Sequence, residues 1–287
     1  MGKQFLPAST GFKMDLASLV SASLAEDIGT GDITTDACVD TGATGTATIK
    51  ARAALVVCGH AAAKETFAQV GAHYTAKVPD GEGVETSDVI ATVQGPLRAL
   101  LMGERVALNF LMRLSGIATH TRYCVRAAGG LKVVDTRKTT PVHRSLEKHA
   151  VRMGGAANHR FALYDAVLIK ENHIMAAGGV ENAVRRAKAA VEGRFDVQVE
   201  VEDLNQLDEA IAAGADSVLL DNMDDTTLKR AVDRAAGRVL LEASGGMTPE
   251  RLPRLDGMGL DRVSIGGLIH QARWVDLSMR ITGLSNE

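Results

Sequence analysis

The sequence is poor in cysteine, in aromatic residues and in long apolar runs, and each shortage excludes a class of protein. Its three cysteines, Cys38, Cys58 and Cys124, are too far apart for a CxxC pair or a zinc motif, so we expect free thiols in a reducing compartment. Aromatic residues make up only 3% of the chain, which argues against surfaces that stack nucleic-acid bases. No apolar run approaches the roughly 20 residues of a membrane helix, and the N-terminus lacks an apolar signal segment. We therefore expect a cytoplasmic protein without membrane contact.

An excess of charge of one sign is missing as well. The chain has 32 lysine and arginine residues against 35 aspartate and glutamate residues, which gives a formal net charge of −3. Because there is no basic excess to meet a phosphate backbone, we do not expect nucleic acid as a partner. The 287 residues, 46% of them apolar and 23% charged, suffice for two globular domains or one large α/β domain.

Six short runs rich in β-branched residues recur through the second half of the chain. Each ends in a polar residue or glycine, and most gaps hold segments with apolar residues at helical spacing, such as 180–192 and 225–237. Apolar strands that alternate with helices predict a parallel sheet covered by helices on its outer face. Six such units favour a (βα) barrel, closed or incomplete, over an open sheet. The runs are 131–135, 166–170, 197–201, 217–221, 238–242 and 262–266.

The first part of the chain has a different pattern. Residues 45–59 and 73–96 are rich in turn and β-forming residues, and apolar positions at helical spacing then predict a long helix from 97 to 128. We therefore expect a smaller N-terminal α/β sandwich domain over residues 1–115, followed by an α/β barrel domain over residues 116–270. The tail, 271–287, is expected to pack with the N-terminal domain.

Charged residues terminate four of the predicted strands: Asp135, Lys170, Glu200 and Asp221. Each of them alone could be an ordinary turn residue. Lysine and glutamate are not preferred in turns, however, and the active sites of α/β barrels lie at the carboxyl ends of the strands. The four side chains together therefore predict a site at one mouth of the barrel.

The stretch from Arg137 to Lys170 holds seven lysine and arginine residues but only two acidic ones. Three of the cations are spaced by four, and we interpret Arg144, Lys148 and Arg152 as a solvent-facing helix surface. The remaining ones lie near strand ends, where guanidinium and ammonium groups can bind carboxylate or phosphate oxygens. The sequence thus predicts a pocket for a polyanion formed by Arg137, Lys138, His159, Arg160 and Lys170.

Glu200 and Asp221 end two consecutive strands. Two carboxylates side by side can bind a divalent metal, most simply Mg²⁺. Alternatively they face a cationic transition state directly, or they form structural salt bridges with nearby lysine or arginine.

Two glycine pairs follow the last two predicted strands, in SGG (244–246) and IGG (265–267). Glycine lets backbone N–H groups approach a ligand closely, and α/β barrels commonly bind phosphate at these strands. We expect a phosphate site there.

Nine stretches carry a more specific pattern: EDIGTGDITT (26–35), GERVALNFLMRLSGIAT (103–119), DTRKTTP (135–141), GGAANHR (154–160), YDAVLIKENH (164–173), VEVE (199–202), LLDNM (219–223), LEASGG (241–246) and SIGG (264–267). Together and in this order, the chain resembles the quinolinate phosphoribosyltransferases, also called carboxylating nicotinate-nucleotide pyrophosphorylases. Two departures are Val142, where the family usually has glycine after TTP, and Ala162, where glycine is common.

The resemblance implies a glycosyltransferase of the pentosyltransferase class. Such an enzyme transfers the phosphoribosyl group of phosphoribosyl pyrophosphate to quinolinate and releases pyrophosphate and CO₂. The product is nicotinate mononucleotide, a precursor of NAD. The resemblance also implies Mg²⁺ as cofactor and a homodimer or larger oligomer.

The resemblance further implies roles for single residues. Arg137, His159, Arg160 and Lys170 would hold the quinolinate carboxylates, and Arg105 would reach in from the partner subunit. Lys138 would contact phosphate oxygens, next to Thr136 in the same substrate-binding loop. Glu200 and Asp221 would bind the ribose hydroxyls and the metal, and they would form the catalytic set with Lys138 and Lys170. The 5′-phosphate would be bound by Ser244, Gly245, Gly246, Ile265, Gly266 and Gly267.

Two other functions compete with this interpretation. A barrel aldolase would use Lys170 as a Schiff-base nucleophile, but it would not explain the paired acids or the arginine cluster. A non-catalytic anion-binding relative is the third hypothesis, and the intact NHR (158–160) and IKENH (169–173) segments argue against it.

Overall fold

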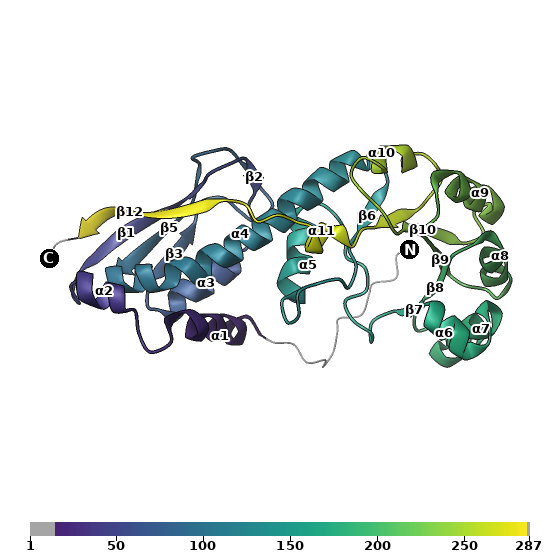
Figure 1. Ribbon diagram of the computed structural model, residues 1–287, viewed down its shortest axis with the longest axis horizontal. Coiled ribbons are helices and arrows are strands. Elements are labelled where there is room, and N and C mark those ends of the chain that lie inside the picture. The colour runs from purple at the N-terminus through teal and green to yellow at the C-terminus, as the bar shows by residue number, and fades with distance from the viewer. Residues whose placement is uncertain (1–14, 286–287) are drawn as a thin grey trace. The chain divides into compact units, whose positions relative to one another are not determined.

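The computed structural model describes residues 15–285, which fold as two compact units (Figure 1). Of the described residues, the first unit contains 15–120, the segment Thr140–Gly154 and 272–285. The second unit contains Thr121–Thr139 and Gly155–Gln271. Among the described residues, no helix combines the length and the apolarity needed to cross a membrane.

The first unit is built on a four-stranded antiparallel sheet in the order β12-β1-β5-β3. Residues of β1 alternate between buried and half-buried positions, as expected for a sheet with one face on a core. The tail of the chain supplies β12, which pairs with β1 along its whole length. The strands of this unit are β1 (Thr44–Ala51), β2 (Leu55–Val56), β3 (His73–Ala76), β4 (Gly83–Val84), β5 (Val89–Pro96) and β12 (Leu277–Ser285).

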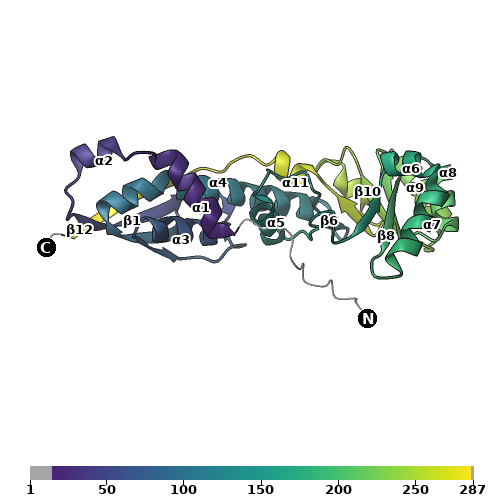
Figure 2. The same ribbon diagram turned by 90° about the horizontal axis from the view of Figure 1, so that it is seen from below.

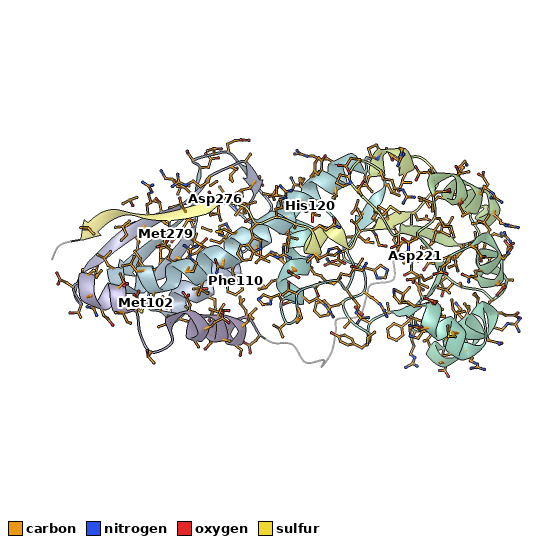
Figure 3. The ribbon with its side chains drawn as sticks, viewed as in Figure 1. Met102, Phe110, His120, Asp221, Asp276 and Met279 are labelled. Carbon is orange, nitrogen blue, oxygen red and sulfur yellow. The ribbon has the colours of Figure 1, made fainter. Side chains whose placement is uncertain are left out.

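Helices cover this sheet through one hydrophobic core. Phe67 and Leu111 are fully buried in the same cluster as Ile49 and Val93 of the sheet. A smaller hydrophobic cluster packs the first helix of this unit against the helices over residues 60–69 and 97–127. It includes Phe110, which is labelled in Figure 3. The helices are α1 (Leu16–Ile28), α2 (Ile33–Cys38), α3 (His60–Gln69) and α4 (Leu97–Ala127), which runs from the first unit into the second.

Helix α5 (Arg144–Met153) also belongs to the first unit, although the sequence boundaries assigned it to the barrel domain. The reason is a buried carboxylate. Glu147, 1% exposed, accepts hydrogen bonds from Arg113 Nη2 at 3.0 Å and from the Thr140 backbone N–H at 2.8 Å. These contacts tie the start of α5 to α4.

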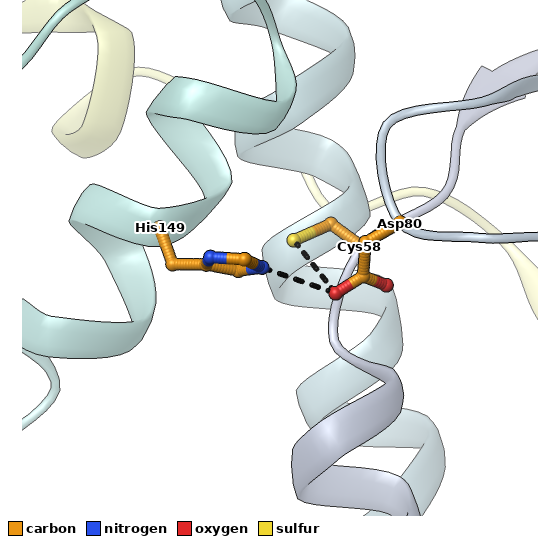
Figure 4. A group of neighbouring side chains, drawn as sticks. All are labelled: Cys58, Asp80 and His149. Carbon is orange, nitrogen blue, oxygen red and sulfur yellow. Dashed lines mark hydrogen bonds and ion pairs between the residues drawn. The ribbon is translucent and has the colours of Figure 1, made fainter.

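A second contact of α5 involves Cys58, Asp80 and His149 (Figure 4). Asp80 Oδ1 accepts the N–H of Gly59 at the start of α3, while Oδ2 lies 3.1 Å from His149 Nε2 and 3.9 Å from Cys58 Sγ. Arg152 Nη2 lies 3.3 Å from His149 Nδ1, and because a guanidinium only donates, the ring proton sits on Nε2 and faces Asp80. The cluster is therefore a hydrogen-bonded tie between three segments rather than a set of metal ligands.

The predicted solvent-facing stripe on α5 is wrong for Lys148, which is only 1% exposed. Glu147, Lys148, Ala150 and Val151 are all buried, and at 100° per residue they span nearly half of the helix circumference. Such a helix packs on more than one side, which its charged sequence does not indicate.

The second unit contains a six-stranded parallel sheet in the order β6-β11-β10-β9-β8-β7. The first of these strands in the chain lies beside the last, which is the connectivity of a sheet that curls into a barrel. Between β6 and β7 the described residues form no ladder, and Ala157 makes a single bridge to Val134 instead. The prediction of a (βα) barrel is confirmed, in its incomplete form. The strands are β6 (Lys132–Val134), β7 (Val167–Ile169), β8 (Val197–Val201), β9 (Ser217–Asp221), β10 (Leu240–Ser244) and β11 (Arg262–Ser264).

The connecting helices α7, α8 and α9 lie side by side outside the parallel strands in both views (Figures 1 and 2). Asp203 is the N-cap of α8. The N-cap of α9 is Asp224, and the adjacent Asp225 is the first residue of that helix. The helices of this unit are α6 (Glu171–Ala177), α7 (Val180–Val191), α8 (Leu204–Ala212), α9 (Asp225–Ala235), α10 (Leu252–Leu255) and α11 (Gly267–His270).

The tie between α4 and α5 predicts a large loss of stability when Glu147 is replaced. Glu147→Ala leaves the Arg113 guanidinium and the Thr140 N–H without their buried acceptor, so we expect the free energy of unfolding to fall by about 3 kcal/mol. Urea denaturation at pH 7 measures this loss. The control is Glu181→Ala, which removes an exposed pair with Arg185 and should change stability by less than about 0.5 kcal/mol. Equal losses in the two variants would contradict the role given to Glu147.

Candidate active site

Oppositely charged side chains meet at the carboxyl ends of β7, β8 and β9. Lys170 follows the last residue of β7, and its Nζ lies 2.8 Å from Glu200 Oε2 near the end of β8. Asp221, labelled in Figure 3, is the last residue of β9. Burial and the charge of Glu200 raise the pKa of Asp221, while the ammonium groups of Lys170 and Lys138 lower it in part. The structure thus brings together the four residues that were predicted to be catalytic.

Lys138 reaches this group across a glycine. A Cβ atom at Gly266 would lie 2.8 Å from Lys138 Cδ, so any larger residue would displace the lysine side chain. Thr136 shapes the same loop, because its Oγ1 accepts the Lys138 N–H at 3.1 Å. The neighbouring N–H of Ile265 donates to Val134 O within the sheet, and Gly267 begins α11.

The glycine loop after β10 is fitted against Asn222. A Cβ atom at Gly245, where φ is +82°, would lie 2.1 Å from Asn222 Oδ1. The Asn222 N–H donates to Ser244 O at 3.0 Å, and its side-chain Nδ2 donates to Asp221 Oδ2 at 2.8 Å. Asn222 therefore links the phosphate loop predicted at 244–246 to Asp221. Sequence reasoning gave Asn222 no role, although asparagine directly after a strand is a known signal for positive φ, here +55°.

Arg251 joins the same two loops from the other side. Its Nη2 donates to Met223 O at 2.6 Å and its Nη1 to Gly245 O at 3.3 Å, while Nε pairs with Asp225 at 2.9 Å. This arginine fixes the backbone after β9 relative to the loop after β10. It was also missed, because a charged residue in a loop carries no sign of such contacts.

Two guanidinium groups, those of Arg137 and Arg160, lie close enough to repel each other. Burial and the charge of Arg137 lower the pKa of Arg160. Arg137 Nε is buried and has no hydrogen-bond partner among residues 15–285. A buried donor without an acceptor is costly, and two adjacent cations are a binding site for an anion.

A hollow of about 390 Å³ adjoins Arg160. It runs along β7 to α6 and α7 and includes Leu163 and His173 in its wall. Lys170, Glu200 and Asp221 do not line it, and Arg160 is the one predicted site residue among the residues of its wall.

The NHR segment (158–160) is held from within the barrel by two buried carboxylates. Asp135, fully buried, accepts the His159 N–H at 2.8 Å and Asn158 Nδ2 at 2.7 Å. Glu242, 1% exposed, lies in the middle of β10 rather than at its end, where the sequence pattern placed it. Its Oε2 is 3.4 Å from His159 Nε2 and accepts from Gln198 Nε2 at 2.9 Å and from Arg262.

The two departures from the family pattern behave differently. Val142 adopts φ +62°, a conformation that strains a β-branched residue and suits the glycine usual at this position. Ala162 is not among the residues with positive φ, and its N–H donates to Asp165 Oδ1 at 3.0 Å. Alanine therefore fits position 162 without strain.

Arg105 lies on α4 within the first unit, and its side chain is exposed. The charged cluster belongs to the second unit, and the contribution of Arg105 from a partner subunit stays a prediction.

The charge on Glu242 predicts how stability depends on pH. Burial raises the pKa of Glu242, but its hydrogen bonds with His159 and Gln198 and the charge of Arg262 bring it down from 4.5 to about 2. Because the folded pKa is below the unfolded one, this stabilisation is complete above about pH 4.5 and is lost as the pH falls toward 2. It amounts to about 3 kcal/mol.

Urea denaturation between pH 7 and pH 2.5 measures this dependence. The stability difference between wild type and Glu242→Gln should shrink as the pH falls through this range. A constant difference would show that Glu242 is not ionised in the folded protein.

Two models of one protein family match most of the chain. Residues 32–115 match the family model of the quinolinate phosphoribosyl transferase N-terminal domain, and residues 117–280 match that of the C-terminal domain. The chain is 42% identical over 278 residues to a probable nicotinate-nucleotide pyrophosphorylase [carboxylating] of Bacillus subtilis, covering 96% of both chains. It is 38% identical over 273 residues to the human nicotinate-nucleotide pyrophosphorylase [carboxylating], covering 93% of this chain and 91% of the human one.

Solved structures show the same fold. NadC from Streptococcus pyogenes is 39% identical, with a TM-score of 0.90 over 94% of this chain and 97% of its own. The nicotinate-nucleotide pyrophosphorylase from Francisella tularensis is also 39% identical, with a TM-score of 0.88 over 93% and 96% of the two chains. Both family models and these relatives cover nearly all of the sequence, and the chain therefore belongs to the quinolinate phosphoribosyltransferase family, the carboxylating nicotinate-nucleotide pyrophosphorylases.

Proposed function

We propose that this protein transfers the phosphoribosyl group of phosphoribosyl pyrophosphate to quinolinate, with release of pyrophosphate and CO₂, to give nicotinate mononucleotide for NAD biosynthesis. Family membership supports the reaction class. The observation that carries it in the structure is the pair Arg137–Arg160, a dication in the same unit as the Lys170–Glu200–Asp221 cluster. Quinolinate is a small dianion with two carboxylates on adjacent carbons, which matches two guanidinium groups close together.

The substrate roles divide between the two ends of the site. Arg137 and Arg160 bind the quinolinate carboxylates, and Lys170 adds a point charge beside them. Lys138, which lies over Gly266, contacts phosphate oxygens. The backbone of Ser244–Gly246 and Ile265–Gly267 binds the 5′-phosphate, with the Gly266 and Gly267 N–H groups preferred over that of Ile265, which is used in the sheet.

His159 contributes to the quinolinate subsite through its position. Its Nδ1 accepts the Arg160 N–H at 2.7 Å, and its Nε2 lies 3.0 Å from Gln198 Oε1. A direct bond from the ring to a carboxylate therefore requires that one of these contacts be released.

Glu200 and Asp221 are suited to Mg²⁺. They offer hard carboxylate oxygens, and the pKa of Asp221 is raised by burial and by the charge of Glu200, which a cation would offset. When bound, Mg²⁺ would neutralise charge on the pyrophosphate leaving group. The rest of its coordination would come from water and substrate oxygens, because Lys170 already pairs with Glu200.

The chemistry needs no covalent intermediate with the protein. The bond between C1 of ribose and the pyrophosphate oxygen breaks, and both electrons leave with pyrophosphate. Glu200 and Asp221 oppose the positive charge that develops at C1, to which the pyridine nitrogen donates its electron pair. The cationic ring then stabilises the electron pair that stays at C2 when CO₂ departs, and a proton takes the place of CO₂ at that carbon. Positioning and preorganised charge supply the acceleration.

The aldolase hypothesis is less well supported by the structure. A Schiff base needs a free amine, whereas Lys170 Nζ donates a hydrogen bond to Glu200 Oε2 at 2.8 Å.

We further propose a cytoplasmic homodimer or larger oligomer in which Arg105 of one subunit completes the site of another. The exposed position of Arg105 on α4 supports donation in trans, and the free thiols of Cys38, Cys58 and Cys124 suit a reducing compartment.

The reaction is tested by following CO₂ release from quinolinate with phosphoribosyl pyrophosphate and Mg²⁺. Glu200→Gln keeps the shape of the side chain but removes its charge, so we expect kcat to fall by about 10²–10³. Glu202→Gln is the matched control, because Glu202 is exposed and bonds only through its backbone to Gln206; its kcat should stay within about twofold. No CO₂ from the wild-type protein would refute the proposed function.

Donation of Arg105 in trans is tested by mixing inactive variants. Neither Arg105→Ala nor Glu200→Ala alone should be active. Subunits mixed under exchange conditions should regain activity, up to about one quarter of wild type, because some mixed dimers hold one intact site. Mixtures that stay as inactive as their parents would show that Arg105 acts within its own chain or not at all.

A further inference from the structure

A chain of hydrogen bonds runs from the barrel interior to the quinolinate subsite. It begins at Glu242, passes through Gln198 and His159, and ends at the backbone N–H of Arg160. Its members come from β10, β8 and the NHR segment, so it connects parts of the barrel that are far apart in sequence.

Which atom donates and which accepts in each of these hydrogen bonds follows from one group, the Glu242 carboxylate. An ionised carboxylate only accepts, so Glu242 Oε2 receives the Gln198 Nε2 amide at 2.9 Å. The oxygen of the same amide, Gln198 Oε1, must then accept a hydrogen bond. Its partner is His159 Nε2, which lies 3.0 Å away. The ring proton is therefore on Nε2, which leaves Nδ1 as the acceptor for the Arg160 N–H at 2.7 Å.

This direction matters because Arg160 is held against repulsion. Burial and the charge of Arg137 lower the pKa of its guanidinium, whose Nη1 donates to Ala166 O at 3.3 Å. Backbone bonds also fix the segment: His159 N–H to Asp135, and Arg160 N–H to the His159 ring. If the ring carried its proton on Nδ1, the second bond would become a clash of two donors.

We propose that Glu242 is a positioning residue for quinolinate: through Gln198 it fixes the tautomer of His159, and the ring in turn fixes Arg160 in the subsite. Glu242 does not touch substrate in this account, and Arg262 balances its buried charge. The inference rests on the proposed function for the identity of the ligand. The direction of the hydrogen bonds does not depend on it.

Steady-state kinetics separate this role from a structural one. Glu242→Gln keeps the shape of the side chain but offers a donor as well as an acceptor, and Gln198→Met removes the relay at similar length. Both variants should raise KM for quinolinate by about 10-fold or more, while KM for phosphoribosyl pyrophosphate stays within about twofold.

The matched control is Asp216→Asn. Asp216 lies in the same unit, just before β9 and hence at the opposite end of the strand from Asp221, where it accepts the Val197 N–H at 2.7 Å and pairs with Lys188. It should lower the melting temperature without changing either KM. Equal KM values for quinolinate in wild type and Glu242→Gln, or parallel rises in both KM values, would overturn the proposal.

A second measurement reads the tautomer itself and needs no catalysis. In protein labelled with ¹⁵N-histidine, the signal of His159 is assigned by its loss in His159→Asn. In wild type, Nε2 should be protonated and Nδ1 unprotonated. Glu242→Gln should show a mixture of the two tautomers. A ring protonated on Nδ1 in wild type would overturn the proposal. If instead the tautomer is as expected and wild type does not consume quinolinate, the proposed function fails and the hydrogen-bond chain stands.

Discussion

Repulsion between the neighbouring guanidinium groups of Arg137 and Arg160 is the constraint on which this site depends. Arg137 has a buried Nε with no hydrogen-bond partner among residues 15–285, and its charge lowers the pKa of Arg160 beside it. Free in solution, two such groups would separate. The loop at 135–138 and the NHR segment keep them in place through Asp135, a fully buried carboxylate that bonds to Asn158 and to His159.

Like charges also lie close together at the other end of the site, where the carboxylates of Glu200 and Asp221 are neighbours. Burial and the charge of Glu200 raise the pKa of Asp221, and Lys170 and Lys138 lower it in part. The parallel sheet makes this possible, because the carboxyl ends of β7, β8 and β9 meet at one edge. In the proposed function, the barrel presents positive charge to a dianion and negative charge to an electron-poor sugar carbon.

Much of this arrangement could be predicted from the sequence, because strand periodicity is a local property. The six parallel strands and the charged residues at their ends follow from short apolar runs that stop at Lys170, Glu200 and Asp221. Other features could not. The buried bond between Gln198 and Glu242 joins two strands at a distance of 44 residues, and nothing in either strand marks those side chains as partners. The packing of α5 with the first compact unit was not predictable either, because its contacts through Glu147 depend on Arg113 of another helix.

The central claim is that the two quinolinate carboxylates bind to Arg137 and to the neighbouring Arg160. Arg137 Nε is the buried donor that has no hydrogen-bond partner among residues 15–285. A crystal structure of the protein with quinolinate tests it most directly. The account predicts a carboxylate oxygen at about 2.9 Å from Arg137 Nε and the other carboxylate within hydrogen-bond distance of Arg160. Quinolinate bound elsewhere, with Arg137 Nε still lacking an acceptor, would contradict it.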